Sequence, residues 1–133
     1  MQTIICSKLD NCSLENGLFN STCCSIIKAT GFLEADEING NYMFNGTFIN
    51  GRHLYIGQKK LTGIWFNKRD AIWVIGPISN LAKGQISYGY AASLAKNTSC
   101  PSMIKLWNER KMSSFQNEEY STIAIVDCLL GSY

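Results

Sequence analysis

The feature that most constrains the fold is a series of short aromatic and β-branched runs between residues 42 and 76, separated by Gly, Asn and Asp. Residues 42–49 and 52–57 are two such runs, and Asn50-Gly51 lies between them. Asparagine and glycine readily adopt the positive φ angles of a two-residue hairpin turn, whose twist must match that of its strands. The pattern therefore predicts a β-hairpin.

Two further runs, residues 63–67 and 71–76, predict a second hairpin with a polar turn at residues 68–70. Because side chains alternate along a strand, both faces of this four-stranded meander carry large apolar groups and both should be covered. Trp65 and Trp73 fall on paired strands, so we expect them to be cross-strand neighbours. We predict a mainly β fold, a single antiparallel β-sandwich or small barrel built on the meander.

The rest of the chain predicts more strands and very little helix. Residues 85–92 and 122–130 are typical of strands, and residues 103–107 predict a short one. Residues 108–119 predict a polar excursion. Residues 23–29 fit a strand or a helical turn, because periodicity does not decide over so few positions. No segment shows an amphipathic helical pattern with caps.

Length and composition indicate one globular unit. A chain of 133 residues can bury a core of its own, and 46% apolar against 17% charged residues predicts a sparsely charged surface. We expect residues 38–133 to form the antiparallel β module as one folding unit. Residues 1–37 would form a cysteine-rich N-terminal arm.

The cysteines predict disulfide bonds. Their number is even and four of the six lie in the first 24 residues. Free buried thiols are the alternative, and a metal site is the weakest interpretation because the chain has one histidine and no C-x-x-C motif. Cys23 and Cys24 should bond to different partners, since a ring between neighbours is strained. The arm would then be held to the body through Cys100 or Cys128. The disulfide candidates are Cys6, Cys12, Cys23, Cys24, Cys100 and Cys128.

Charge and hydropathy exclude two classes of partner. The formal net charge of +2 is small and spread along the chain, which argues against nucleic acid or an anionic membrane as the main partner. No run of about 18 apolar residues is present, so we expect no membrane span. The N-terminus lacks a basic segment followed by a long apolar one, so no signal peptide is expected.

Four sequons for N-glycosylation are present, at Asn11, Asn20, Asn45 and Asn97. Asn45-Gly46 falls inside a predicted strand, where this pair more readily marks a bulge or a turn. The candidate glycosylation sites are therefore Asn11, Asn20 and Asn97.

The sequence predicts no catalytic centre. His53 is the only histidine and directly follows a turn and Arg52, so we expect a surface or rim side chain. A glycosidase needs two carboxylates across a cleft, but most acidic residues fall in predicted turns. No phosphate-binding glycine loop or nucleotide fingerprint occurs. We expect a protein that is not an enzyme and has neither cofactor nor metal.

Several aromatic side chains could stack on sugar rings or, alternatively, fill the core. Stacking on nucleic-acid bases is less favoured, because the basic residues do not alternate with the aromatic ones. The candidate binding aromatics are Trp65, Trp73, Tyr88, Tyr90 and Trp107.

Short motifs follow one another in a fixed order from residue 39 to residue 128. They are Asn39-Gly40-Asn41-Tyr42, Asn50-Gly51-Arg52-His53-Leu54-Tyr55, Ile64-Trp65-Phe66, Trp73-Val74-Ile75-Gly76, Cys100-Pro101, Trp107 and Val126. This order resembles a short β-rich module of multidomain proteins from protists and marine invertebrates. The resemblance implies a compact building block and supplies no catalytic residues. Residues 1–37 depart from that pattern, and bonds to Cys100 and Cys128 would make them an elaboration of it.

Two functions remain as expectations. The first is a non-enzymatic structural or interaction protein that docks into a larger assembly by its edges and aromatic faces. Abundant Asn, Ile and Lys fit an AT-rich genome, and a Met start beside disulfides is unusual for a secreted protein. Both suggest a minor capsid or cement component of a large DNA virus. The second is an extracellular glycan- or protein-binding module, similar to a lectin. The expected partners are other protein subunits or glycans, and the expected location is the virion or the extracellular space rather than the cytosol.

Overall fold

Nine β-strands make up most of the described chain. The structure is a computed structural model that describes residues 23–82, 89–110, 118–121 and 123–129. A single helical turn, α1 (Ser79–Ala82), and two 3₁₀ turns, η1 (Asp36–Ile38) and η2 (Pro101–Met103), accompany the strands. In chain order the strands are β1 (Ile26–Thr30), β2 (Gly40–Ile49), β3 (Arg52–Gly57), β4 (Thr62–Asn67), β5 (Ile72–Pro77), β6 (Ala91–Ser93), β7 (Trp107–Arg110), β8 (Glu118–Ser121) and β9 (Ile125–Cys128).

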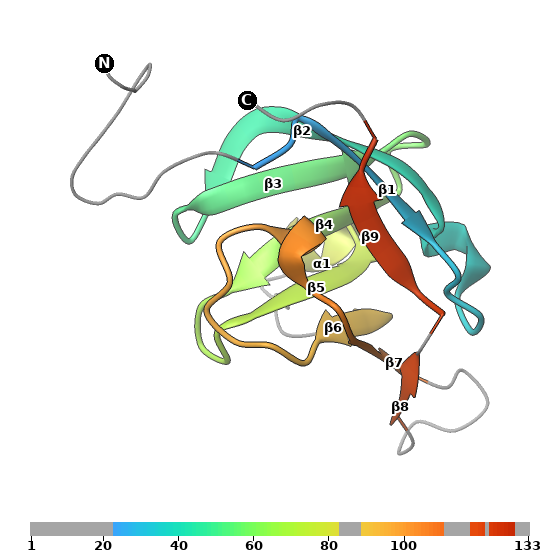
Figure 1. Ribbon diagram of the computed structural model, residues 1–133. Coiled ribbons are helices and arrows are strands. Elements are labelled where there is room, and N and C mark those ends of the chain that lie inside the picture. Colours follow the sequence, from blue (N-terminus) through green and yellow to red (C-terminus); the bar gives the residue numbers. More distant parts are fainter. Residues whose placement is uncertain (1–22, 83–88, 111–117, 122, 130–133) are drawn as a thin grey trace.

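The strands form one antiparallel sheet in the order β8-β7-β6-β5-β4-β3-β2-β1-β9. Strands β1 to β8 follow one another as a meander, and β9 returns to pair with β1. The sheet curls into a half-barrel, so one face is concave and the other convex (Figure 1). The predicted mainly β, antiparallel fold is confirmed, and its architecture is closer to the small barrel than to the sandwich.

Turn chemistry explains the regular part of the meander. Asn50 and Gly51 both have positive φ, 55° and 82°, as the β2–β3 hairpin requires. The predicted irregularity at Asn45-Gly46 is also present. On β2 four steps separate Phe44 from Phe48, whereas their partners on β3 are only two residues apart, which is a β-bulge.

The predictions for the C-terminal half were less accurate. Residues 101–103 form η2 and β7 begins only at Trp107, so the predicted strand over 103–107 is wrong. Pro101 at the first helical position favours η2, because the fixed φ angle of proline suits the start of a helical turn. The expected excursion over 108–119 instead contains most of β7 and the start of β8. These strands are polar, so their pairing with each other was not visible as an apolar alternation.

The N-terminal arm is not separate from the module where the structure describes it. Strand β1 lies between β2 and β9 in the sheet, and Ile27, Ala29 and Phe32 belong to the main core. Residues 23–37 therefore contribute to the same folding unit as the residues that follow. Cys6 and Cys12 lie outside the described residues.

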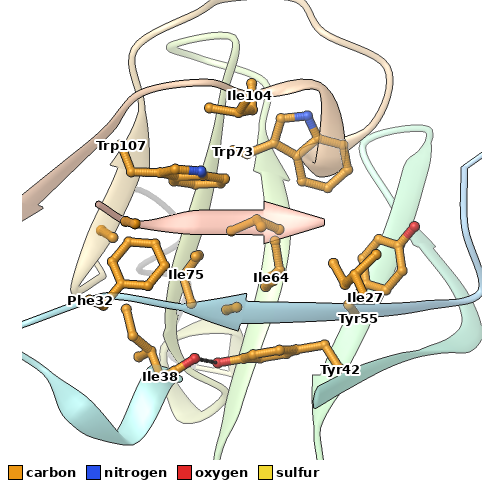
Figure 2. Packing of buried hydrophobic residues seen from close by; sticks show 14 of the residues in the cluster. Ile27, Phe32, Ile38, Tyr42, Tyr55, Ile64, Trp73, Ile75, Ile104 and Trp107 are labelled. Carbon is orange, nitrogen blue, oxygen red and sulfur yellow. Dashed lines mark hydrogen bonds between the residues drawn. The ribbon is translucent and has the colours of Figure 1, made fainter. Parts of the chain in front are cut away.

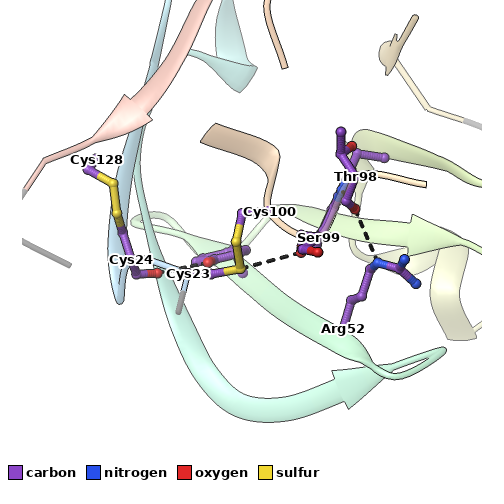
Figure 3. The surroundings of a disulfide bond; sticks show 9 residues. Cys23, Cys24, Arg52, Thr98, Ser99, Cys100 and Cys128 are labelled. Carbon is purple, nitrogen blue, oxygen red and sulfur yellow. Dashed lines mark hydrogen bonds between the residues drawn. A yellow bond between two sulfur atoms is a disulfide. The ribbon is translucent and has the colours of Figure 1, made fainter. Parts of the chain in front are cut away.

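Two disulfides join this segment to distant parts of the chain. Cys23 bonds to Cys100 and Cys24 bonds to Cys128, as Figure 3 shows. The prediction that the adjacent cysteines take different partners is confirmed. The bonds connect the start of β1 to the residue before η2 and to the end of β9, across 77 and 104 residues.

The concave face holds the main core (Figure 2). Its largest side chains have almost no exposed surface, and two of its polar groups are satisfied internally. The Tyr42 hydroxyl donates to the Ile38 carbonyl at 2.7 Å, and the Tyr55 hydroxyl donates to the Cys24 carbonyl at 2.7 Å. The bulkiest members are Trp73, Trp107, Tyr42, Tyr55, Phe32 and Phe66, followed by Ile27, Ile38, Ile64 and Ile75.

A second, smaller cluster lies on the convex face and consists of Leu54, Trp65 and Val74, with Leu81 from α1 packed against it. Trp65 is opposite Val74 and Trp73 is opposite Phe66. The two tryptophans therefore point to opposite faces, and the expectation that they are cross-strand neighbours is wrong. A register shift of one residue suffices to exchange the faces.

Candidate functional site

The tryptophans that could have stacked on sugars are core residues. Trp65, Trp73 and Trp107 have no exposed surface, so none of them can offer a ring to a ligand. Tyr90 is half-buried and packs against the main core, and Tyr88 lies outside the described residues. Of the five aromatic candidates, only Tyr90 lines a described cavity.

His53 is buried, so the expected surface or rim position is wrong. It is 7% exposed, and its ring lies 4.0 Å from that of Phe44 and 5.9 Å from that of Tyr55 (centroid distances). Phe48, directly opposite on β2, contacts its edge. Burial lowers the pKa of His53 to about 4, so the imidazole is neutral at pH 7. Aromatic neighbours and burial make this histidine a packing residue.

The one fully buried carboxylate among the described side chains supports the backbone. Glu109 on β7 is 4% exposed, and its Oε1 accepts the N–H groups of Leu33 (2.9 Å) and Glu34 (2.8 Å). These bonds hold the loop after β1 against β7. Because Oε1 accepts from two backbone donors, Glu109 anchors this loop to the sheet.

The loop that carries the Asn97 sequon is fixed to the sheet. The Thr98 carbonyl accepts from Arg52 Nε at 3.1 Å and from Trp73 Nε1 at 3.0 Å, and Figure 3 shows the first bond. The Arg52 guanidinium also lies 3.8 Å above the ring centre of Phe66. Asn97 itself is exposed, so its side chain is accessible for glycosylation, which stays a prediction. Asn11 and Asn20 lie outside the described residues.

A polar cavity of about 490 Å³ lies where η1, the start of β2 and the β3–β4 turn meet. Its wall contains the carboxylates of Asp36 and Glu37 and the ring of Tyr90. Tyr90 hydrogen-bonds Glu37, and its pKa is raised by burial and by that carboxylate. The remaining lining residues are Asn39, Gly40, Asn41, Tyr42, Gly57, Gln58, Lys59, Leu61, Thr62, Pro77 and Ser79.

Little of this polar cavity is preorganised for catalysis. Tyr42 is committed to Ile38, and its hydroxyl lies 3.0 Å from Thr62 Oγ1. Burial raises the pKa of Tyr42 to about 12, so it stays protonated. Asn39 donates to the carboxylate of Asp36 at 3.1 Å. The cavity therefore offers hydrogen-bonding groups and one aromatic ring, as a site for a polar ligand would.

An apolar groove of about 580 Å³ lies on the convex face over β9, β1, β2 and β3. Ile26 is paired with Met43, Met43 is paired with Ile56, and the N–H of Leu129 donates to the Ile26 carbonyl at 3.0 Å. The four side chains thus form one row across four adjacent strands, which we call the outer apolar row. Met43 is 57% exposed and Leu129 is 42% exposed.

Polar residues border the outer apolar row. The next row on the same face consists of polar residues: Lys28 of β1 is paired with Asp127 of β9 and with Asn41 of β2. The groove itself is lined by Lys60 at the β3–β4 turn, and none of the described residues that line it carries a carboxylate. An exposed apolar strip with a polar border is typical of a docking surface for another molecule.

The described residues contain neither a cluster of metal ligands nor a helix that could span a membrane. No group of three or more His, Cys, Asp or Glu side chains within them could hold a metal ion. No helix in this part of the chain is long and apolar enough to cross a membrane.

No family model, no curated protein and no solved structure matches the chain. The resemblance to the β-rich module therefore stays a prediction.

The sequence did contain a signal for the outer apolar row. The alternation over residues 42–49 places Met43 opposite to the face of Tyr42, and both are apolar. What was missing was the identity of the neighbouring strands, since β1 and β9 come from the two ends of the described chain.

Proposed function

We propose that the protein is a non-enzymatic interaction protein that docks into a larger assembly through the outer apolar row. The observation that carries the proposal is the alignment of Leu129, Ile26, Met43 and Ile56 across four strands with Met43 more than half exposed. Apolar surface exposed in this way gains free energy when a partner removes it from water. Leu81 of α1 packs against the neighbouring cluster of Leu54, Trp65 and Val74, whereas the outer apolar row lines an open groove.

The disulfides support a docking role because they hold the surface in shape. The row depends on β9 lying beside β1, and the Cys24–Cys128 bond joins the segment before β1 to the end of β9. A surface that is ordered before binding loses less conformational entropy on association. Disulfides also favour an oxidising compartment or a virion over the cytosol.

For the assembly we propose a virion, with this chain as a minor capsid or cement component. The support is compositional, namely the abundance of Asn, Ile and Lys that fits an AT-rich genome. Mass spectrometry and cryo-electron microscopy of purified particles would test it. Particles that lack the chain would overturn the virion while leaving the docking role open.

The docking role is tested by incorporation of variants into the native assembly. Met43→Asp places a charge in the outer apolar row and should reduce co-purification with the assembly at least about tenfold. Met103→Asp is the matched control, because Met103 is 55% exposed and does not line the groove. Equal incorporation of the Met43→Asp variant and the wild type would contradict the proposal.

The polar cavity favours a second candidate function, the binding of a glycan. Carboxylates and amides can hydrogen-bond sugar hydroxyls, and the ring of Tyr90 offers an apolar face. A glycan array with the whole protein, followed by titration of Tyr90→Ala and Glu37→Gln, tests this function. Binding that survives both substitutions would place the glycan elsewhere.

A further inference from the structure

We infer that the partner presents an acidic amphipathic α-helix of about three turns to the outer apolar row. This inference rests on the proposed docking function and adds the chemistry of the partner. It is argued from the span of the row, its exposure and its charge.

The span of the row matches a short helix. Neighbouring strands lie about 4.8 Å apart, so the four strands from β9 to β3 place Leu129 and Ile56 about 14 Å apart. A helix of ten residues is about 15 Å long, and its apolar side chains at i, i+3, i+4 and i+7 lie on one stripe. Such a helix can lay three anchors along the row, as in other helix-in-groove interactions.

Exposure argues for a macromolecule and against a small ligand. Pockets for small molecules cover most of the ligand surface, whereas Met43 and Leu129 stand at the surface with large exposed fractions. A helix brings an apolar stripe together with a polar back that remains in water. Met43 suits this contact, because its unbranched thioether side chain can adapt to the shape of the incoming anchor.

Charge argues for acidic residues beside the stripe. Lys60 is the single cationic residue among the described groove-lining residues, and none of them is acidic. On the neighbouring row Lys28 lies opposite Asp127, so that pair adds little net charge. Asn41, Asn45 and Gln58 supply amide groups that can bond the carboxylates or the polar back of a helix.

Two synthetic 14-residue peptides test the inference directly. Both carry leucines at i, i+3, i+4 and i+7 and differ only in having glutamate or lysine at the flanking positions. Binding to the full chain is measured by fluorescence anisotropy at low and at physiological salt. We expect the glutamate peptide to bind about fivefold more tightly than the lysine peptide at low salt, with a smaller ratio at higher salt.

Variants assign the binding to the groove. Lys60→Glu should reverse the preference between the two peptides, whereas Lys59→Glu makes the same charge change at a residue that lines the other cavity. Met43→Asp should weaken the glutamate peptide more than about tenfold. Equal binding of both peptides, no binding of either, or binding unaffected by Lys60→Glu would each overturn the inference.

Self-association is a further outcome with a clear meaning. If the wild type dimerises in analytical ultracentrifugation and Met43→Asp is monomeric, the occupant is a second copy and the helix inference is wrong. If Met43→Asp is lost from the native assembly while neither peptide binds, docking stands and only the partner chemistry fails.

Discussion

Neighbouring residues on the same strands show how differently the two faces of the sheet are used. On β2, Tyr42 is 2% exposed on the concave face, whereas Met43 is 57% exposed on the convex face. On β1, Ile27 is fully buried and Ile26 is only half-buried. Both faces are apolar in sequence, so hydropathy alone does not distinguish the buried core from an exposed apolar surface.

The convex face is itself divided into a covered part and an open part. Over β3, β4 and β5, Leu54, Trp65 and Val74 are buried with the help of Leu81 from α1. Over β9, β1 and β2, the described chain leaves Met43 and Leu129 open. The difference teaches that the same strand pattern yields buried core or exposed apolar surface according to what is packed over it.

The largest effect is expected for a truncation on the concave face. Trp73→Ala removes a fully buried ring and its hydrogen bond to Thr98, and should lower the free energy of unfolding by about 3–5 kcal/mol. Urea denaturation followed by circular dichroism measures the loss. A loss below about 1 kcal/mol would mean that the concave face is not the principal core.

A somewhat smaller effect is expected when the disulfide that joins the segment before β1 to the end of β9 is removed. Cys24→Ala with Cys128→Ala opens a bond across 104 residues and should cost about 2–4 kcal/mol. It should also speed amide exchange in β9, which supplies one end of the outer apolar row.

The control for that variant is the other disulfide. Cys23→Ala with Cys100→Ala should destabilise the protein by a comparable amount without selective exchange in β9, since this bond joins the segment before β1 to the residue before η2. Identical exchange patterns in the two double variants would show that Cys24–Cys128 does not position β9.

The concave face should also respond to acid through His53. Burial lowers its pKa to about 4, so between about pH 6.5 and 4 the unfolded chain binds the proton more readily than the folded one. Stability from this group is therefore complete above pH 6.5 and is lost as the pH falls toward 4, by roughly 3 kcal/mol.

Replacement of the imidazole isolates this contribution. His53→Phe keeps a ring among Phe44, Phe48 and Tyr55 and should flatten the fall in the free energy of unfolding over that range. The difference between the two pH profiles, measured by urea titration, removes the contribution of carboxylates common to both. Parallel profiles would show that His53 titrates normally in the fold.

The smallest effect on stability is expected on the open convex face. Met43→Asp should change the free energy of unfolding by less than about 1 kcal/mol, because the side chain is already more than half in water. The same variant should lose docking, so stability and binding separate at this position. A loss of several kcal/mol would place Met43 in the core instead.

Features that depend on neighbouring residues in the chain were predicted correctly, whereas features that depend on the pairing of separate strands were not. The β2–β3 hairpin and its bulge were predictable, because Asn50-Gly51 and Asn45-Gly46 act on their own backbone. The strands β7 and β8 were not, because their polar residues become a ladder only by pairing with each other. The opposite faces of Trp65 and Trp73 depended on a register that differs by one residue from the expected one.

The candidate sites show the same division. Six cysteines and the adjacency of Cys23 and Cys24 indicated disulfides with different partners, but only the fold brings Cys100 and Cys128 to them. The outer apolar row joins residues 26, 43, 56 and 129, whose separation in the chain hides their common face. The only signal for this row in the sequence was the alternation along β2, which placed the apolar Met43 on the face opposite to Tyr42.

By itself, then, the amino-acid sequence determined the strand-rich class, the tight bends of the meander and the presence of disulfides, because these follow from local backbone preferences and side-chain chemistry. The tertiary structure alone decided which apolar face is sealed, where His53 and the tryptophans lie, and that β9 returns to β1 to complete the outer apolar row. The physical reason is that burial and strand pairing join segments that are far apart in the chain. Both depend on the arrangement of the whole sheet and not on any single run of residues.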